Sequence, residues 1–236
     1  MKGMNEKMSQ EYMGTAISQK ELGQIAAKRR PLSYYTYAFG KRTFDIAGSL
    51  CAMVVLAPVF LFLSAVIFAM DPGRVIYGHE RLGKGGKKIK IWKFRSMYQN
   101  ADEIFDNFTE EQKAEFYRDF KLDNDPRITP VGNFLRKSSL DELPQLWNIF
   151  CGDLSFVGPR PIVEEELVKY GGESERLLSV KPGLTGYWQA NGRNLIGYEN
   201  GRREMELYYV ENRSALLDFK ILLKTFGTVV QGKGAQ

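Results

Sequence analysis

The sequence has a single histidine and two isolated cysteines, and this scarcity excludes several kinds of catalytic site. A histidine-rich zinc centre is excluded, and a Ser-His-Asp triad would have to use His79. Cys51 and Cys151 lack metal-ligand spacing and fit a reducing, cytoplasmic setting. The sequence also has no Walker-type loop and no GxGxxG motif. Catalysis is therefore expected to depend on carboxylates, lysines and arginines.

The length of 236 residues is enough for one sizeable core, and no internal repeat or low-complexity segment divides the chain. Lys and Arg together number 33, against 28 Asp and Glu, which gives a formal net charge of +5. This balance favours partners that carry phosphate or an anionic membrane surface.

An uncharged run of 25 residues, from Ile46 to Met70, is the strongest local feature of the sequence. Its length is typical of a membrane helix, with a buried helix of a soluble protein as the alternative. Pro58 lies in the middle of the run, where it removes a backbone donor and clashes with the preceding turn. We therefore expect a kink or break near Ala57.

Basic residues flank this run on both sides. They are Lys28, Arg29, Arg30, Lys41 and Arg42 before it, and Arg74, Arg81, Lys84, Lys87, Lys88, Lys90, Lys93 and Arg95 after it. Because basic flanks prefer the cytoplasmic side, a spanning helix would leave one of them outside. Two half-helices bent at Pro58 would return to the same side, so we predict a re-entrant, monotopic membrane helix.

These features divide the chain into three expected segments. Residues 1–40 form a polar arm with a short helix that has a capping box at Ser18 to Glu21. Residues 41–73 form the re-entrant helix, and residues 74–236 form a cytoplasmic catalytic domain. The aromatic residues of 34–39 fit either a membrane interface or an aromatic edge of the core.

The third segment is expected to be α/β and rich in helix. Residues 75–97 predict two strands around a Gly-rich turn, a short β-hairpin, and residues 102–120 predict a charged surface helix. From Lys121 onward, short helices alternate with Gly-Pro loops. Apolar residues at helical spacing over 216–230 predict either an interfacial amphipathic helix or a core-facing one.

The stretch SSLDELPQLWNIF, residues 138–150, sets Asp141 beside Glu142 where a helix should begin. Ser139 and Glu142 have the spacing of a capping box, and Asp141 could itself cap the helix. A carboxylate at a helix N-terminus is also expected to keep a low pKa and to stay ionised as a nucleophile or metal ligand. Spacing alone leaves both interpretations open.

Four arginines recur in the loops around this pair: Arg127, Arg136, Arg160 and Arg193. In rigid turns, guanidinium groups and backbone amides can bind phosphate oxygens, which suggests a diphosphate site. Plain salt bridges are the alternative. Mg²⁺ fits such a site because it needs only one or two protein carboxylates and bridges substrate phosphates.

An ordered set of motifs resembles the bacterial sugar transferases, which are monotopic polyprenyl-phosphate phosphoglycosyl transferases. Beside the Pro-broken run, the motifs are KRTFD at 41–45, IWKFRSM at 91–97, DPRIT at 125–129, LRKSSLDELPQLWNIFCGDLSFVGPRP at 135–161, KPGLTGYWQANGRN at 181–194 and YYVENRSALLDFKILLKT at 208–225. The resemblance covers roughly residues 41–231. One departure is Ala57-Pro58, where some members carry Ser-Pro.

The resemblance implies transfer of a sugar 1-phosphate from a UDP-sugar to a polyprenyl phosphate such as undecaprenyl phosphate, with release of UMP. Asp141 would be the nucleophile that forms a covalent aspartyl-phosphosugar, and Glu142 would hold Mg²⁺. The reaction would begin a polysaccharide or glycoconjugate at the cytoplasmic face of the bacterial inner membrane. The sequence near WQANGRN is closer to that of transferases of galactose or glucose 1-phosphate than to that of transferases of bacillosamine-type sugars.

The same resemblance assigns expectations to the basic residues near the carboxylates. Arg136 and Arg160 are expected near the substrate phosphates. For Arg193, Lys93 and Arg95, phosphate binding and structural pairing are both open.

At the start of the membrane helix, the resemblance singles out Lys41, Arg42 and Asp45. The two cations are expected to meet lipid phosphate, and Asp45 to cap the helix or tie it to the core. Membrane phospholipids are further expected partners, nucleic acid is not, and a homodimer is compatible with the sequence. Two other functions stay open, namely a metal-dependent phosphatase of lipid diphosphates and a membrane-anchored basic adaptor.

Overall fold

The computed structural model describes residues 32–119, 122, 124–192, 197–198 and 201–230. The chain divides into two units, residues 1–39 and 40–236. In the first unit, the described residues form the beginning of a helix in which Tyr35 and Phe39 are exposed. The short helix predicted at Ser18 lies outside the described residues.

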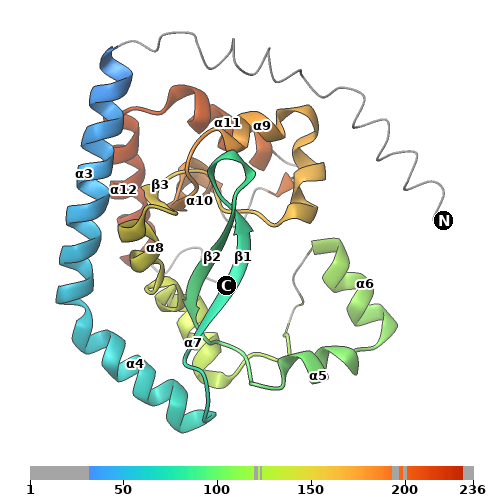
Figure 1. The fold of residues 1–236 in the computed structure, drawn as a ribbon. Coiled ribbons are helices and arrows are strands. Elements are labelled where there is room, and N and C mark those ends of the chain that lie inside the picture. The colour runs from blue at the N-terminus through green and yellow to red at the C-terminus, as the bar shows by residue number, and fades with distance from the viewer. Residues whose placement is uncertain (1–31, 120–121, 123, 193–196, 199–200, 231–236) are drawn as a thin grey trace. The chain divides into compact units, whose positions relative to one another are not determined.

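Helices α3 (Leu32–Val55) and α4 (Ala57–Met70) are separated by Leu56 and bent by 61° (Figure 1). The break expected near Ala57 is confirmed. Pro58 lies in the first turn of α4, where its missing N–H breaks no helical hydrogen bond, so it starts a new helix. Helix α3 begins before position 41, because nothing in residues 32–40 stops it. The helix therefore includes residues 32–40 of the predicted arm, whereas the two units of the chain meet between residues 39 and 40, close to the expected end of the arm.

Within the described residues, no single helix is long and apolar enough to cross a membrane. Helices α3 and α4 pass that test only as a bent pair, by length and composition. In α4 only Leu63 and Ile67 are buried, and they pack against Phe94 and Leu135. Leu61 and Phe62 are among the side chains that α4 leaves exposed.

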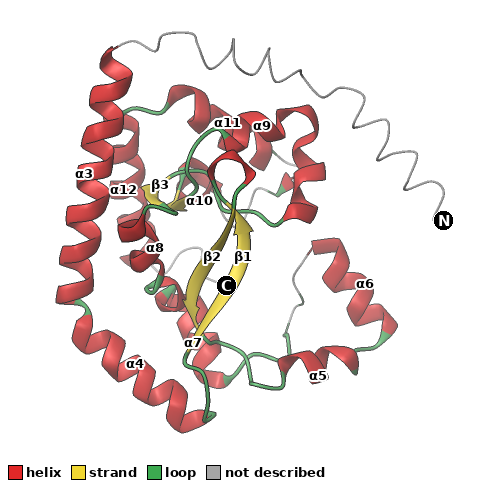
Figure 2. Cartoon of the chain, viewed as in Figure 1, coloured by secondary structure: helices red, strands yellow, loops and turns green. Residues whose placement is uncertain are grey.

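Strands β1 (Ile76–Leu82) and β2 (Lys88–Phe94) form the predicted antiparallel hairpin around the short 3₁₀ turn η1 (Lys84–Gly86). Gly85 and Gly86 have φ of 72° and 76°, a conformation that favours glycine and closes the turn. Figure 2 shows that helices predominate and that this hairpin is the most prominent strand pair. The α-rich α/β expectation is confirmed to that extent.

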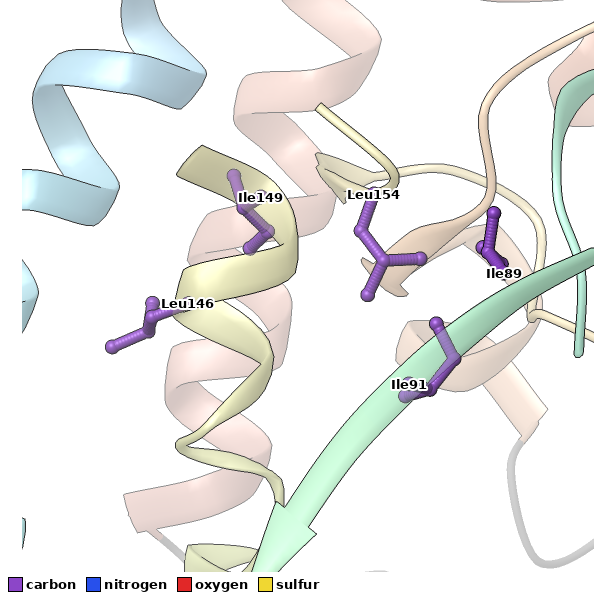
Figure 3. Close-up of a cluster of buried hydrophobic side chains, with 5 residues drawn as sticks. All are labelled: Ile89, Ile91, Leu146, Ile149 and Leu154. Carbon is purple, nitrogen blue, oxygen red and sulfur yellow. The ribbon is translucent and has the colours of Figure 1, made fainter. Parts of the chain in front are cut away.

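The hairpin packs against α8 (Gln145–Cys151) through β2. Ile89 and Ile91 of β2 lie against Leu146 and Ile149 of α8 and against Leu154 (Figure 3). Short strands β3 (Ser155–Val157) and β4 (Gly183–Thr185) pair in parallel, and their residues Phe156 and Leu184 pack against this cluster. The core thereby fixes the end of β2 close to the turn that precedes α8.

The other elements are helical. They are α5 (Ala101–Asp106), α6 (Glu110–Asp119), α7 (Pro130–Ser138), η2 (Leu140–Glu142), η3 (Glu164–Glu173), α9 (Ser174–Leu178), α10 (Tyr187–Gly192), α11 (Arg202–Asn212) and α12 (Ala215–Val230). The single helix predicted over 102–120 is therefore wrong. Thr109 starts a second helix, because its hydroxyl accepts from the Gln112 N–H and the Gln112 side chain accepts from the Thr109 N–H.

Helix α12 faces the core on one side, as one of the two expectations for it predicted. Ile221 is buried against Val157 and Tyr209, so one face belongs to the core. A second face leaves a row of apolar side chains exposed, namely Leu216, Phe219, Leu223 and Phe226.

Candidate active site

Asp141 and Glu142 lie in the 3₁₀ turn η2, between α7 and α8. Helix α7 ends at Ser139, which adopts the left-handed conformation with φ of 59° and donates its backbone N–H to the carbonyls of Leu135 and Arg136. Asp141 is buried and Glu142 is half-buried.

The predicted capping role is wrong in its details. The side chain of Ser139 makes no capping hydrogen bond to η2, because this residue ends α7 through its backbone. Helix α8 begins only at Gln145, so neither carboxylate lies in its first turn. The cap interpretation therefore does not explain the acidic pair.

Lys93, at the end of β2, bridges the two carboxylates. Its Nζ donates to Glu142 Oε1 at 2.9 Å and lies 3.6 Å from Asp141 Oδ2. One ammonium group therefore holds both acidic side chains on the same side of η2. Of the two roles left open for Lys93, the structure shows pairing with carboxylates.

Burial raises the pKa of Asp141 above its ordinary value of 3.8. Lys93 opposes the shift, the neighbouring Glu142 adds to it, and Arg136 opposes it. The low pKa expected for a helix N-terminus is thus wrong, because Asp141 lies outside the first turn of α8 and is largely removed from water. The ionised form depends on the two cations.

Arg136 comes from the last turn of α7, and its charge acts on Asp141. Its Nε donates to Ser96 Oγ at 2.9 Å. Burial lowers the pKa of its guanidinium, while the charges of Asp141 and Asp125 raise it. Of the predicted basic residues, Arg136 and Lys93 are thus the two whose positive charges act on Asp141.

Arg127 pairs with a carboxylate, which is the salt-bridge alternative left open for the four arginines. Its guanidinium donates to both carboxylate oxygens of Asp125, the shortest contact being 2.6 Å. It also lies 5.0–5.2 Å from the ring centroids of Phe105, Phe108 and Phe116. Arg127 therefore fixes α5 and α6 to the DPRIT loop, a role that only the folded chain reveals.

Arg95 is also engaged elsewhere. Its Nη2 donates to the backbone carbonyl of Asp71 and lies 3.6 Å from the Asp71 carboxylate. Arg95 thus ties the end of α4 to β2, which corresponds to the structural pairing expected as one of its two roles.

Lys41, Arg42 and Asp45 dock α3 onto the rest of their unit and do not open the helix, because α3 begins at Leu32. Lys41 Nζ lies 2.7 Å from Asp218 Oδ2, and Arg42 donates to the carbonyls at the end of α8. Asp45 is buried and accepts hydrogen bonds from the Ser155 hydroxyl and the Phe156 N–H, each at 3.0 Å. The tie to the core, one of its two expected roles, is confirmed, and the cap is wrong.

Arg160 and Arg193 are the last two predicted residues. The backbone N–H of Arg160 donates to Glu206 Oε2 at 3.0 Å, and its charge acts on Arg81. Arg193 lies outside the described residues.

The family-model comparison decides what kind of protein has this arrangement. Residues 36–232 match the model of the bacterial sugar transferases. The chain belongs to the bacterial sugar transferase family.

Several curated relatives of this sugar transferase carry specific names. It is 46% identical over 207 residues to a UDP-galactose-lipid carrier transferase of Erwinia amylovora and 45% identical over 200 residues to an undecaprenyl-phosphate galactose phosphotransferase of Salmonella typhimurium. These matches cover 86% and 84% of the chain but only 43% and 42% of the relatives. The exopolysaccharide production protein ExoY of Rhizobium meliloti is 42% identical over 83% of the chain and 87% of its own length.

A buried polar cluster in this sugar transferase was missed by sequence reasoning. Arg202 lies between the rings of Trp188 and Tyr198, at 4.3 and 4.1 Å from their centroids, and its Nε is 3.3 Å from Glu206 Oε1. Tyr198 donates to Glu166 at 2.9 Å. The only signal in the sequence was the i, i+4 spacing of Arg202 and Glu206, which is common on exposed helices.

Proposed function

We propose that this sugar transferase moves a sugar 1-phosphate from a UDP-sugar to a polyprenyl phosphate, such as undecaprenyl phosphate, and releases UMP. The observation that carries the proposal is the pair Asp141 and Glu142 held by one lysine, with the charge of Arg136 acting on Asp141. Relatives named for a UDP-galactose-lipid carrier and for undecaprenyl-phosphate support the donor and acceptor classes. They also favour galactose among the hexoses.

In the first step, a carboxylate oxygen of Asp141 attacks the phosphorus that bears the sugar. The bond from this phosphorus to the bridging oxygen breaks, and UMP leaves with the electron pair. A covalent aspartyl-phosphosugar remains. Lys93 and Arg136 favour this step because they oppose the protonation of Asp141 that burial promotes.

In the second step, a phosphate oxygen of the polyprenyl phosphate attacks the same phosphorus. The acyl-phosphate bond breaks and the Asp141 carboxylate is regenerated. The product is a polyprenyl diphosphate that carries the sugar. Donor and acceptor thus use the same nucleophile in turn, and neither step needs a histidine.

Mg²⁺ fits the residues at this site. The described residues contain no group of three or more His, Cys, Asp or Glu side chains arranged for a metal. Mg²⁺ needs only one or two carboxylates, because phosphate oxygens and water supply its other ligands. Glu142 would hold it, and the bound ion would neutralise charge on the transferring phosphates. Glu142 is already held in place by Lys93.

We further propose that the bent pair α3 and α4 enters one leaflet of the bacterial inner membrane from the cytoplasmic face. The exposed apolar side chains of α4, such as Leu61 and Phe62, support lipid contact. The exposed row on α12 would lie at the interface. In this arrangement Asp141 can meet a water-soluble donor and a lipid-borne acceptor, as required to begin a polysaccharide.

The test is incubation with UDP-galactose, Mg²⁺ and undecaprenyl phosphate, followed by measurement of UMP and inorganic phosphate. UMP release that requires the lipid for repeated turnover supports the transferase. Release of inorganic phosphate from lipid diphosphates would instead indicate a phosphatase. If no product forms with any UDP-sugar, a membrane-anchored adaptor is the remaining interpretation.

A further inference from the structure

One face of strand β1 continues the active site beyond Lys93. In the hairpin register, Tyr77 lies opposite Lys93, His79 opposite Ile91 and Arg81 opposite Ile89. Cross-strand partners project from the same face of a sheet, and alternate residues of a strand share that face. Tyr77, His79 and Arg81 therefore form a row beside the lysine that holds the two carboxylates.

On this face of the hairpin, the side chains of β1 are more exposed to solvent than those of β2. On β2, Ile89 and Ile91 are 7% and 2% exposed because they pack against α8, whereas Tyr77 on β1 is 60% exposed. His79 is exposed as well. The two rings lie 6.4 Å apart between centroids and are inclined by 53°. Two aromatic side chains thus stay open to solvent on the face of the hairpin that carries Lys93.

Positive charge lies at both ends of the row. Lys93 is opposite Tyr77, and Arg81 follows His79 on the same face. The stretch from Tyr77 to Arg81 spans about 13 Å of strand, which is comparable to an extended nucleoside phosphate. The charges that act on His79 come from Arg81 and Lys93 and, more weakly, from Glu166 and Glu165. Glu166 is in turn 4.0 Å from Arg81 and accepts from Tyr198.

The geometry of the proposed reaction indicates which part of the donor would bind along this row. In-line attack by Asp141 places the leaving UMP on the opposite side of the phosphorus. The exposed side chains of α4 are apolar and suit a lipid chain, whereas the β1 row joins aromatic rings with cations. Aromatic rings stack on nucleobases, and cations bind the attached phosphate.

We propose that Tyr77 and His79 form the binding site for the uracil base of the donor, with the nucleotide phosphate beside Lys93. The inference rests on the proposed function, because it assigns the nucleotide half of the same donor. It makes the β1 face the part of the site that distinguishes a nucleotide from a bare sugar phosphate.

Titration calorimetry with UMP and with ribose 5-phosphate tests this assignment. Replacing both rings, as Tyr77→Ala with His79→Ala, should weaken UMP binding roughly tenfold, because stacking on one base is worth about 1–3 kcal/mol and tenfold is about 1.4 kcal/mol. Binding of ribose 5-phosphate should change less than about twofold, because it has no base to stack. Tyr77→Phe keeps the ring and should retain most of the UMP affinity.

The matched control is Tyr208→Ala. Tyr208 is 45% exposed and also belongs to an aromatic pair, with Tyr187, but it lies on α11. It should leave UMP affinity unchanged. Equal UMP affinity in the double variant and the unsubstituted protein would overturn the assignment, as would equal losses for UMP and ribose 5-phosphate.

A second measurement needs no substitution. His79 is the only histidine of the chain, so in tag-free protein its imidazole gives a single set of NMR signals. UMP should shift these signals through the ring current of the base, and ribose 5-phosphate should shift them far less. If UMP is released from UDP-galactose but leaves His79 unshifted, the proposed function stands and the uracil site is wrong. If the protein neither releases UMP from UDP-galactose nor binds UMP, both the proposed function and the uracil site are wrong.

Discussion

Lys93 donates a hydrogen bond of 2.9 Å to Glu142, and the same ammonium lies 3.6 Å from Asp141. The proposed nucleophile and metal ligand therefore share one cation before any substrate binds. A diphosphate that enters the site brings negative charge toward two carboxylates, and the lysine offsets part of that repulsion. This relationship leads to the first two predictions.

Asp141→Asn removes the nucleophile and preserves the shape of the side chain. We expect UMP release to fall by at least roughly a thousandfold, because the neutral amide cannot form the acyl phosphate. Intact-protein mass spectrometry should show the phosphosugar adduct with the unsubstituted protein and none with the variant. Asp102→Asn, which changes an exposed carboxylate on α5, is the control. An adduct on the Asp141→Asn protein would refute the assignment.

Lys93→Met removes the shared cation and keeps much of the apolar stem. We expect kcat/KM to fall roughly 100-fold, since the loss of one donor to the transferring charge typically costs that much. Lys90→Met is the matched control, because Lys90 is exposed and alternate residues of β2 face opposite sides. Similar losses in both variants would mean that general positive charge, and not the bridge, matters.

Asp45→Ala tests the docking of α3. The change leaves the Ser155 hydroxyl and the Phe156 N–H without their buried acceptor, which should cost about 1–3 kcal/mol of unfolding free energy. The melting temperature should fall by about 3–10 °C. Asp106→Ala, at an exposed position of α5, should leave it nearly unchanged. An equally small effect at Asp45 would show that these hydrogen bonds contribute little to stability.

Glu206 gives a pH dependence of stability. Burial raises its pKa from 4.5 to about 7, against the opposing charge of Arg202. Between these values the folded protein binds a proton that the unfolded chain does not, so stability should fall as pH rises from about 4.5 to 7. The contribution is fully present below pH 4.5 and lost above about pH 7.

The measurement compares the melting temperatures of the unsubstituted protein and of Glu206→Gln at about pH 5 and about pH 8, which lie on either side of the raised pKa. Because the amide that replaces the Glu206 carboxyl cannot titrate, the decrease between the two pH values should be smaller in the variant. Parallel decreases would assign the pH dependence to other groups.

Local patterns predicted much of this fold. Pro58 marked the break between two apolar helices, and Gly85 and Gly86 marked the turn between β1 and β2. These features depend on backbone geometry that one or two residues impose on their neighbours. The acidic pair was also found from sequence, but only with the family resemblance, since its spacing equally fits a cap.

The surroundings of charged groups could not be predicted in the same way. Arg127 and Arg136 lie nine residues apart in the sequence, yet one lies near the rings of three phenylalanines and the other acts on Asp141. The raised pKa of Asp141 depends on burial by segments that are distant in sequence. Such differences arise from tertiary packing, which residue spacing does not specify.

The docking of α3 has a mechanical consequence for catalysis. Lys41, Arg42 and Asp45 join this helix to α12, α8 and β3 by side chains with defined partners. A bilayer that receives α4 would therefore hold Asp141 at one fixed height above its surface. The lipid phosphate must then travel to that height, so the depth at which a lipid carries its phosphate would help to select the acceptor.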